Sequence, residues 1–563
     1  MKHIFTTIAA FATAAAIFSG CIKETMPQGS TRTAAQLAES PGALKAMADA
    51  LPANIGMANF KGYLSGYNVH FDCGLPGFHG AFEAMLEDIA TLGSNVWYNR
   101  FHAHGFGRLT GQEDSHVNTH WFWECYYGWI KGTNDIIGTI DKSTTDPTIQ
   151  NYLGTAYLYR AMFYLDMARL YEFKENKYTT IDPSLLKLTV PIVTDETTDE
   201  QAKNNPRAPR SELYALIISD LENAEKYIDP TANLYNVATL GAVYAQKART
   251  YIEMTYWDDA EANYADSTIF YAQKAIDVSG RTPLTQAQWT DPTDGFNNGA
   301  KNNSWIWGIK TSTENLGNLT SFTAHMSCEA LWGYGPLSQI GASKKFYDRI
   351  PESDWRKLSW LSPEFLEDPL NGPLKDKYQF AVKGQDKIDF LSEGNSEFDP
   401  AAPYESIKFR PAQGECNDYP VGGTADHALI RVEEMHFLKA EAQAAKNDLA
   451  SATATLSELV KTRNAEYAFS ASSKDLFLEE MLFQKRIEFW GEGILIFDYK
   501  RLNKGVEKGY AGSNVPSVLW YNTIGRSPEW NFVIPRGEHQ YNEALSEKNN
   551  NPVFSNSVTL WAE

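Results

Sequence analysis

Hydrophobic positions between Asn151 and Ser279 recur at spacings of three and four residues, which places them on one face of a helix. In 211–228 the apolar positions are Leu213, Leu216, Ile217, Leu221, Ala224, Tyr227 and Ile228. The stretch 240–254 instead repeats small residues, a pattern that lets a neighbouring helix pack closely. Gly280 follows the next apolar segment and predicts a helix end. The pattern predicts a scaffold of successive amphipathic helices.

Large and small residues alternate between these helices in a way that resembles part of a tetratricopeptide helix pair. The units do not recur at a constant period. A second helix pair is predicted at 431–446 and 449–463, with Asn447-Asp448 at the turn, followed by a helix at about 474–490. We therefore predict a mainly α fold built from irregular tetratricopeptide-like helix pairs.

The stretch 281–428 separates the two helical regions and differs from both in composition. It holds 11 of the chain's 25 prolines and only short apolar runs. We predict a loop-rich insertion with short strands, and binding residues tend to lie on such loops. The predicted division is a signal peptide at 1–20, a tether at 21–40, a helical scaffold with aromatic loops at 41–280, a loop-rich ligand-binding subdomain at 281–428 and a helical scaffold at 429–563.

The N-terminus has the pattern of a targeting signal. Lys2 precedes an apolar run at 4–18, and Ser19-Gly20 stands directly before Cys21. This arrangement resembles the lipobox of a bacterial lipoprotein, whose cysteine is acylated; the alternative is an ordinary secretory peptide with an incidental cysteine. No later run reaches the roughly 20 apolar residues of a spanning helix. We expect attachment to a membrane through Cys21.

Composition narrows the class of partner. The formal net charge is −20 and the pI is near 5.1, which disfavours nucleic acid and anionic lipid as partners. Apart from Cys21, the cysteines are far apart in sequence, and they could form two disulfides or remain buried free thiols. They are Cys73, Cys125, Cys328 and Cys416. No CxxC pair is present, so a zinc cluster is not indicated.

Two aromatic segments are candidate ligand contacts. The first is Trp97-Tyr98-Asn99-Arg100, where flat rings stand beside an amide and a guanidinium. Sugar rings stack on aromatic faces while their hydroxyls bond planar polar groups. The alternative for Trp97 is a place in the core with Tyr98 covering it. The second segment contains Trp332 and Tyr334, and the glycines beside Tyr334 predict an exposed turn that displays both rings.

Other aromatic and histidine positions are predicted to be structural. His116 and His120 have the i, i+4 spacing of metal ligands, but Val117 stands where an HExxH motif needs glutamate. We predict ordinary polar histidines and no metal site. The aromatic residues of 121–129 are too dense for a ligand cradle and predict core packing, as does at least one of Trp305 and Trp307.

The C-terminal third carries the most specific pattern. Residues 484–493, Gln-Lys-Arg-Ile-Glu-Phe-Trp-Gly-Glu-Gly, and 497–501, Phe-Asp-Tyr-Lys-Arg, resemble the SusD-like (RagB/SusD) family of outer-membrane lipoproteins from Bacteroidetes. The segment 530–538 is similar to that family's terminal Ile-Pro-x-x-Glu pattern. Leu495 stands where the family usually has arginine, and Glu543 where it has proline. Both departures lie in structural motifs.

The resemblance implies a cell-surface, lipid-anchored protein of the outer membrane. It implies binding of an oligosaccharide or polysaccharide and delivery to a SusC-like TonB-dependent transporter, with the helices serving as scaffold and transporter contact. The family shares no ligand motif, so the six candidate residues come from local chemistry alone. No cofactor is predicted, and a structural calcium ion is left open.

Two other functions are weighed against glycan uptake. One is uptake of a peptide by a RagB-type lipoprotein. The other is glycoside hydrolysis by a pair of carboxylates. The motifs GxSxG, HExxH and a phosphate-binding glycine loop are missing, and the tryptophan-rich loops favour sugar over peptide. Glu488 and Arg486 are predicted to lie on a helix that Gly491 and Gly493 end, and Asp498 with Arg501 to form part of a buried polar network rather than a catalytic site. We predict a binding protein that is not an enzyme.

Overall fold

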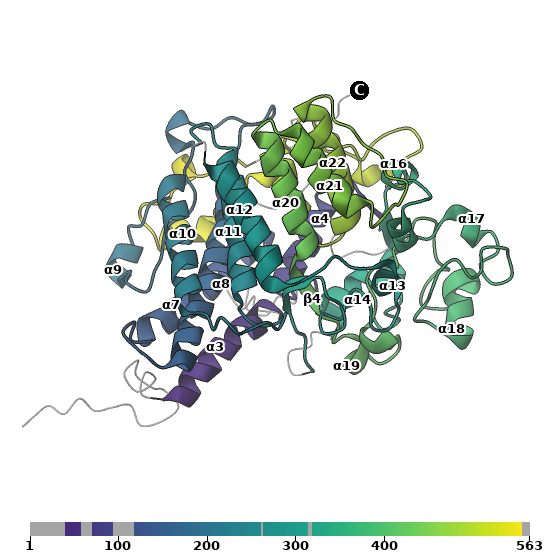
Figure 1. The fold of residues 1–563 in the computed structure, drawn as a ribbon, viewed down its shortest axis with the longest axis horizontal. Helices are drawn as coiled ribbons and strands as arrows, with labels where there is room; N and C mark the ends of the chain where they lie inside the picture. The colour runs from purple at the N-terminus through teal and green to yellow at the C-terminus, as the bar shows by residue number, and fades with distance from the viewer. Residues whose placement is uncertain (1–39, 58–69, 94–116, 261–262, 314–317, 554–563) are drawn as a thin grey trace, which may run out of the picture.

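The computed structural model describes residues 40–57, 70–93, 117–260, 263–313 and 318–553 (Figure 1). Long helices occupy the left and centre of the view, and the short helices α17 and α18 extend at the right (Figure 1). The fold is mainly helical with a few short strands, which confirms the predicted class. Cys21 lies outside the described residues, as do Trp97, Tyr98, Asn99 and Arg100.

The described part of the N-terminal scaffold contains six long helices. They are α3 (Pro41–Ile55), α7 (Val117–Thr139), α8 (Pro147–Tyr171), α10 (Arg210–Tyr227), α11 (Leu240–Thr255) and α12 (Tyr264–Ser279). Asp146 caps α8 by accepting hydrogen bonds from the first backbone amides, and Gly280 ends α12 with a φ of 62°. The α8 helix packs on α7 and α10, and α11 packs on α12. The small residues of 240–254 predicted close packing on a neighbouring helix, and the pair of α11 with α12 confirms it.

The second group of helices comes from the C-terminal third. It comprises α20 (Val432–Ala445), α21 (Leu449–Val460), α22 (Lys474–Phe489) and α23 (Leu495–Arg501). Asn447 makes the tight turn between α20 and α21 with a φ of 62°. The α20 helix packs against α12, although roughly 150 residues of chain separate the two helices. Both groups of helices contribute to one continuous apolar core.

Four short strands tie the middle segment to the helices. Strand β1 (Ile89–Thr91) pairs antiparallel with β3 (Ile340–Ala342), and β2 (Trp305–Ile309) pairs antiparallel with β4 (His427–Arg431). The β2–β4 register shifts on either side of Trp307, and both tryptophans of β2 are buried. Core packing therefore holds for both of them.

Short helices make up the remaining regular structure. The α-helices are α4 (Leu75–Ala84), α9 (Asp199–Ala202), α13 (Gln286–Thr290), α14 (Phe322–Met326), α15 (Gly335–Ser338), α16 (Lys344–Arg349), α17 (Pro363–Leu366), α18 (Gly384–Ile388) and α19 (Tyr419–Gly422). Single turns of 3-10 helix lie between them, including η3 (Trp355–Ser359). Most of these short elements fall in the middle segment, where loops and turns dominate, as the composition predicted.

The dense aromatic residues of α7 are core residues. Trp121, Trp123, Tyr126 and Trp129 are all buried, with Trp121 edge-on to Phe78 of α4 at a centroid distance of 4.5 Å. The cysteines Cys73, Cys125, Cys328 and Cys416 are buried free thiols, so the second of the two alternatives holds.

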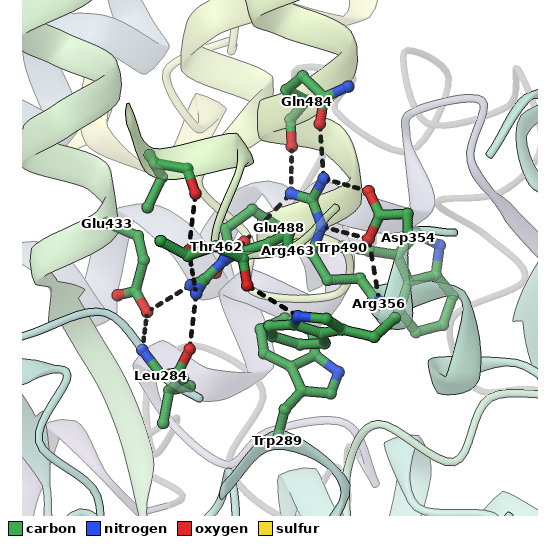
Figure 2. Close-up of polar contacts among 12 residues, drawn as sticks. Leu284, Trp289, Asp354, Arg356, Glu433, Thr462, Arg463, Gln484, Glu488 and Trp490 are labelled. Atoms are coloured by element: carbon green, nitrogen blue, oxygen red, sulfur yellow. Dashed lines mark hydrogen bonds and ion pairs between the residues drawn. The ribbon is translucent and has the colours of Figure 1, made fainter. Parts of the chain in front are cut away.

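A buried carboxylate in α22 joins the middle segment to the C-terminal helices. Glu488 is fully buried and accepts hydrogen bonds from Arg463 at 3.0 and 3.1 Å and from Arg356 at 3.2 Å (Figure 2). It also accepts a hydrogen bond from Arg431 at 3.1 Å. Arg431 ends β4, Arg463 follows α21 and Arg356 lies in η3. Asp354 binds Arg356 in turn. One side chain therefore fixes three elements that are distant in sequence.

Burial and charge act in opposite directions on Glu488. Burial alone would raise its pKa, but the guanidiniums of Arg463, Arg431 and Arg356 outweigh burial and hold the pKa well below its usual range. The carboxylate is therefore ionised. Such a cluster is stable only while its charges balance, because an unpaired charge in the interior is costly.

Replacing Glu488 by glutamine should lower the free energy of unfolding by about 3–5 kcal/mol, because the amide leaves three guanidiniums without their shared anion. Urea denaturation at pH 7 measures the change. Glu479→Gln, at an exposed position of the same helix, is the matched control and should change stability by less than about 0.5 kcal/mol. Equal stability of the two variants would contradict the role given to Glu488.

Candidate ligand-binding site

The turn at 331–336, which carries Trp332 and Tyr334, is fixed against α14 by backbone contacts. The amide of Tyr334 donates to the carbonyl of Ala324 at 2.6 Å. A Cβ atom on Gly333 would lie 2.6 Å from that same carbonyl oxygen, and one on Gly335 would lie 1.9 Å from the carbonyl of Ser327. The two glycines are therefore required for close approach of the chains. The rings of Trp332 and Tyr334 are both half-buried, so the turn is less exposed than its glycines predicted.

Tyr334 is oriented by two histidines. Its ring stacks on His325 at a centroid distance of 5.0 Å with an interplanar angle of 19°, and its hydroxyl is hydrogen-bonded to the ring of His70. The Nε2 of His325 donates to the carbonyl of His70 at 2.7 Å. The arrangement holds the tyrosine ring in one orientation, as a preformed binding surface requires.

Burial determines the charge of His325. It lowers the pKa of this residue to about 4, so the imidazole is neutral near pH 7. A neutral ring with its proton on Nε2 is the form that can donate to the His70 carbonyl. The stacking surface behind Tyr334 is therefore uncharged at physiological pH.

Trp332 lies beside the one-turn helix α19. A Cβ atom on Gly422 would lie 2.5 Å from the six-membered ring of the indole, so only glycine leaves room for Trp332 there. The indole Nε1 is buried and has no hydrogen-bond partner among the described residues. Tyr419, at the start of α19, is 38% exposed and adds a third ring to this region.

Segments that flank the undescribed stretches also contact this turn. The amide of Gly93 donates to the carbonyl of Ser338 at 3.0 Å, and His70 bonds Tyr334. Gly93 precedes the stretch 94–116, and His70 follows the stretch 58–69. The structure thus describes Trp332 and Tyr334, while the candidates at 97–100 stay a prediction.

Three residues of this region were not found from the sequence. His70 and His325 are isolated histidines without a spacing that marks them, and Tyr419 stands in a short Asp-Tyr-Pro turn. His70 reaches Tyr334 through a tertiary contact between segments far apart in the chain. His325 stacks on Tyr334, and Tyr419 lies on the helix that packs beside Trp332. Local pattern carries no signal for such contacts.

Two further predictions concern a metal site and a membrane-spanning helix. The Nδ1 of His120 lies 3.0 Å from Glu124, whereas His102, His104 and His116 lie outside the described residues. Within the described ranges, no group of three or more His, Cys, Asp or Glu side chains is placed to hold a metal ion. In the same part of the chain, no helix is both long enough and apolar enough to cross a membrane.

Comparison with known families identifies the class of protein to which this helical scaffold belongs. A family described as "Starch-binding associating with outer membrane" matches residues 79–252, and one described as "SusD family" matches 408–556. Together these matches span more than half of the sequence. The chain belongs to the SusD-like (RagB/SusD) family.

Individual relatives agree with this family. The SusD-like protein P38 of Formosa agariphila is 23% identical over 451 residues, which cover 73% of this chain and 79% of that protein. A SusD-like carbohydrate binding protein from Bacteroides vulgatus has the same fold with a TM-score of 0.64 at 20% identity, covering 90% of this chain and 97% of its own. Surface glycan-binding protein A from Bacteroides thetaiotaomicron gives a TM-score of 0.62 at 17% identity, covering 92% and 99%.

The pH dependence of stability tests the burial of His325. Its folded pKa of about 4 is below the roughly 6.5 of an exposed histidine. Its contribution to the free energy of unfolding is therefore complete above pH 6.5 and is lost as the pH falls towards 4. We expect His325→Gln to reduce the pH-dependent loss of stability in that window by roughly 1 kcal/mol per pH unit. Urea titrations at pH 7, 6 and 5 measure it. Parallel profiles for both proteins would show that His325 titrates normally.

Proposed function

We propose that this protein is a cell-surface lipoprotein that binds an oligosaccharide or polysaccharide and delivers it to a SusC-like TonB-dependent transporter. The observation that carries the proposal is the fixed turn at 331–336, where Trp332 and Tyr334 lie two residues apart and are both half-buried. His325 stacks behind Tyr334. A half-buried ring leaves one part accessible to a ligand, while its packed part fixes its orientation. Two of the structural relatives are named as carbohydrate- or glycan-binding proteins.

The chemistry of the turn suits a sugar. The axial C–H faces of a pyranose pack on aromatic rings, and their hydroxyls require hydrogen-bonding groups nearby. Trp332 supplies an indole and Tyr334 a phenol, while Tyr419 adds an exposed ring on α19. A peptide ligand would gain from an exposed strand edge, but the strands β1 and β3 are buried short elements. The aromatic turn therefore favours a saccharide.

The remaining parts of the proposal concern anchoring and transport. The lipobox-like Ser19-Gly20-Cys21 supports acylation of Cys21, and the family match supports the outer membrane. The scaffold formed by α7, α8, α10, α11 and α12 would face the transporter, because the aromatic turn lies on other elements. Ligand captured at the turn would then be released into the transporter beneath.

Affinity electrophoresis in gels that contain candidate glycans tests the binding residues. Trp332→Ala should lose about five-fold or more in affinity, because an aromatic stacking platform contributes about 1–3 kcal/mol. The double replacement Trp332→Ala with Trp97→Ala should abolish retardation while leaving the melting curve intact. Phe270→Ala removes a ring that is 57% exposed on α12 and is the matched control. Retardation of the double variant equal to wild type would remove the assignment.

The proposal that the protein is not an enzyme has its own test. Mature protein incubated with each glycan that it retards should release no new reducing ends over 24 hours, roughly the time in which even a slow hydrolase completes many turnovers. Reducing-sugar assays measure this directly. Product formation that survives further purification would favour a glycoside hydrolase instead.

A further inference from the structure

A second groove lies away from the aromatic turn and shares none of its residues. It has a volume of about 750 Å³ and lies between the start of α13, η3 and the end of α21. This size is within the range of protein sites for small ligands. Its polar lining includes Thr285, Gln286, Glu352, Ser353, Lys357, Lys377, Lys461 and Thr462.

Trp355 forms the flat surface of this groove. Its Nε1 donates to the carbonyl of Thr462 at 2.9 Å, and its ring is edge-on to Trp289 at a centroid distance of 5.6 Å. The guanidinium of Arg463 lies over the ring at 5.1 Å. The side chain is half-buried. Its hydrogen bond and its two neighbours fix the ring plane, so a ligand that stacks on it need not order it.

The buried network around Glu488 sets the floor of the groove. Arg463 donates to the carbonyl of Leu284 at 2.6 Å and to Glu488, while Arg356 holds Asp354 (Figure 2). Leu284, Asp354 and Arg463 all line the groove. The floor is therefore held by the same ion pairs that stabilise the fold, and it is rigid before any ligand arrives.

The accessible charge in the groove is positive. Asp354 is occupied by Arg356, which leaves Glu352 as the exposed carboxylate of the lining. Glu352 is shared between Lys357 at 2.7 Å and Lys377 at 3.8 Å, and Lys461 is exposed without an ion pair to any described residue. Lys357 is buried and paired, so the accessible charges are those of Lys377, Lys461 and Glu352, and their balance is positive on a chain with a net charge of −20.

We propose that this groove is a second binding site, specific for saccharides that carry carboxylate or sulfate groups. The sugar ring stacks on Trp355, its acidic substituent lies near Lys461 and Lys377, and its hydroxyls bond the Thr, Ser and Gln side chains of the rim. The saccharide class rests on the proposed function, whereas the site and its preference for anions rest on the groove alone. An acidic peptide could meet the same lysines, but the fixed indole plane beside small hydroxyl side chains favours a sugar.

Isothermal titration calorimetry on the mature chain tests this site with three tetrasaccharides: galacturonic acid for the carboxylate, a sulfated galactan for the sulfate ester, and neutral galactan. Lys461→Glu should weaken binding of at least one acidic probe five-fold or more, because it reverses the charge of an exposed residue without disturbing a buried contact. Lys548→Glu makes the same charge change at an exposed lysine outside the groove and should have no effect. Trp355→Ala should abolish acidic-probe binding, and Glu352→Gln should strengthen it.

Outcomes for the two sites are separable. The proposed site in the groove is supported if Lys461→Glu weakens binding of the acidic probe while Trp332→Ala does not, whatever happens to binding of the neutral probe at the aromatic turn. The inference is overturned if neither acidic probe binds, if the neutral probe competes equally, or if Lys461→Glu matches Lys548→Glu. It is also overturned if an oligoglutamate peptide displaces the acidic saccharide and binds more tightly. Raising the salt concentration from 50 to 500 mM, on the order of a three-fold change in Debye length, should weaken acidic-probe binding.

Discussion

The ion-pair cluster around Glu488 is the constraint on which the rest of the structure depends. Helix pairs alone form only the two scaffolds, and the long middle segment has too little regular structure to define its own position. Arg356 belongs to that segment, Arg431 and Arg463 belong to the C-terminal scaffold, and all three share the carboxylate of Glu488. Neither side can shift without breaking a buried ion pair to Glu488, which costs several kcal/mol.

The cluster also explains how a loop-rich segment can hold aromatic side chains in fixed positions. Loops hold binding residues in place only when something rigid fixes their ends. Lys408 extends the cluster through Glu492 at 2.7 Å and through the carbonyls of Glu488 and Trp490. The strand pairing of β2 with β4 and of β1 with β3 secures the segment at two further points. The aromatic turn and the cationic groove therefore both lie on a supported framework.

Sequence periodicity predicted the helices well because the apolar face of a helix is written in the spacing of nearby residues. The helices α10, α11 and α22 begin and end within a residue or two of the predicted bounds. The aromatic core of α7 was also predictable, since rings on several faces of one helix have to be buried. Tertiary contacts were not predictable. Gly333 and Gly335 mark close approach to α14 rather than an exposed turn, and nothing in the local sequence joins His70 to Tyr334.

Charge distribution gives the two sites different properties. A net charge of −20 repels acidic polymers at long range, but salt at physiological strength screens beyond about 8 Å. Inside that distance the local lysines of the groove determine the interaction, whereas His325, which backs the ring of Tyr334, is neutral. An acidic polysaccharide would therefore be held by its charged units at the groove and by uncharged ring faces at the turn. Two weak sites on one rigid scaffold bind a long chain more tightly than either site alone, because binding at one raises the effective concentration at the other.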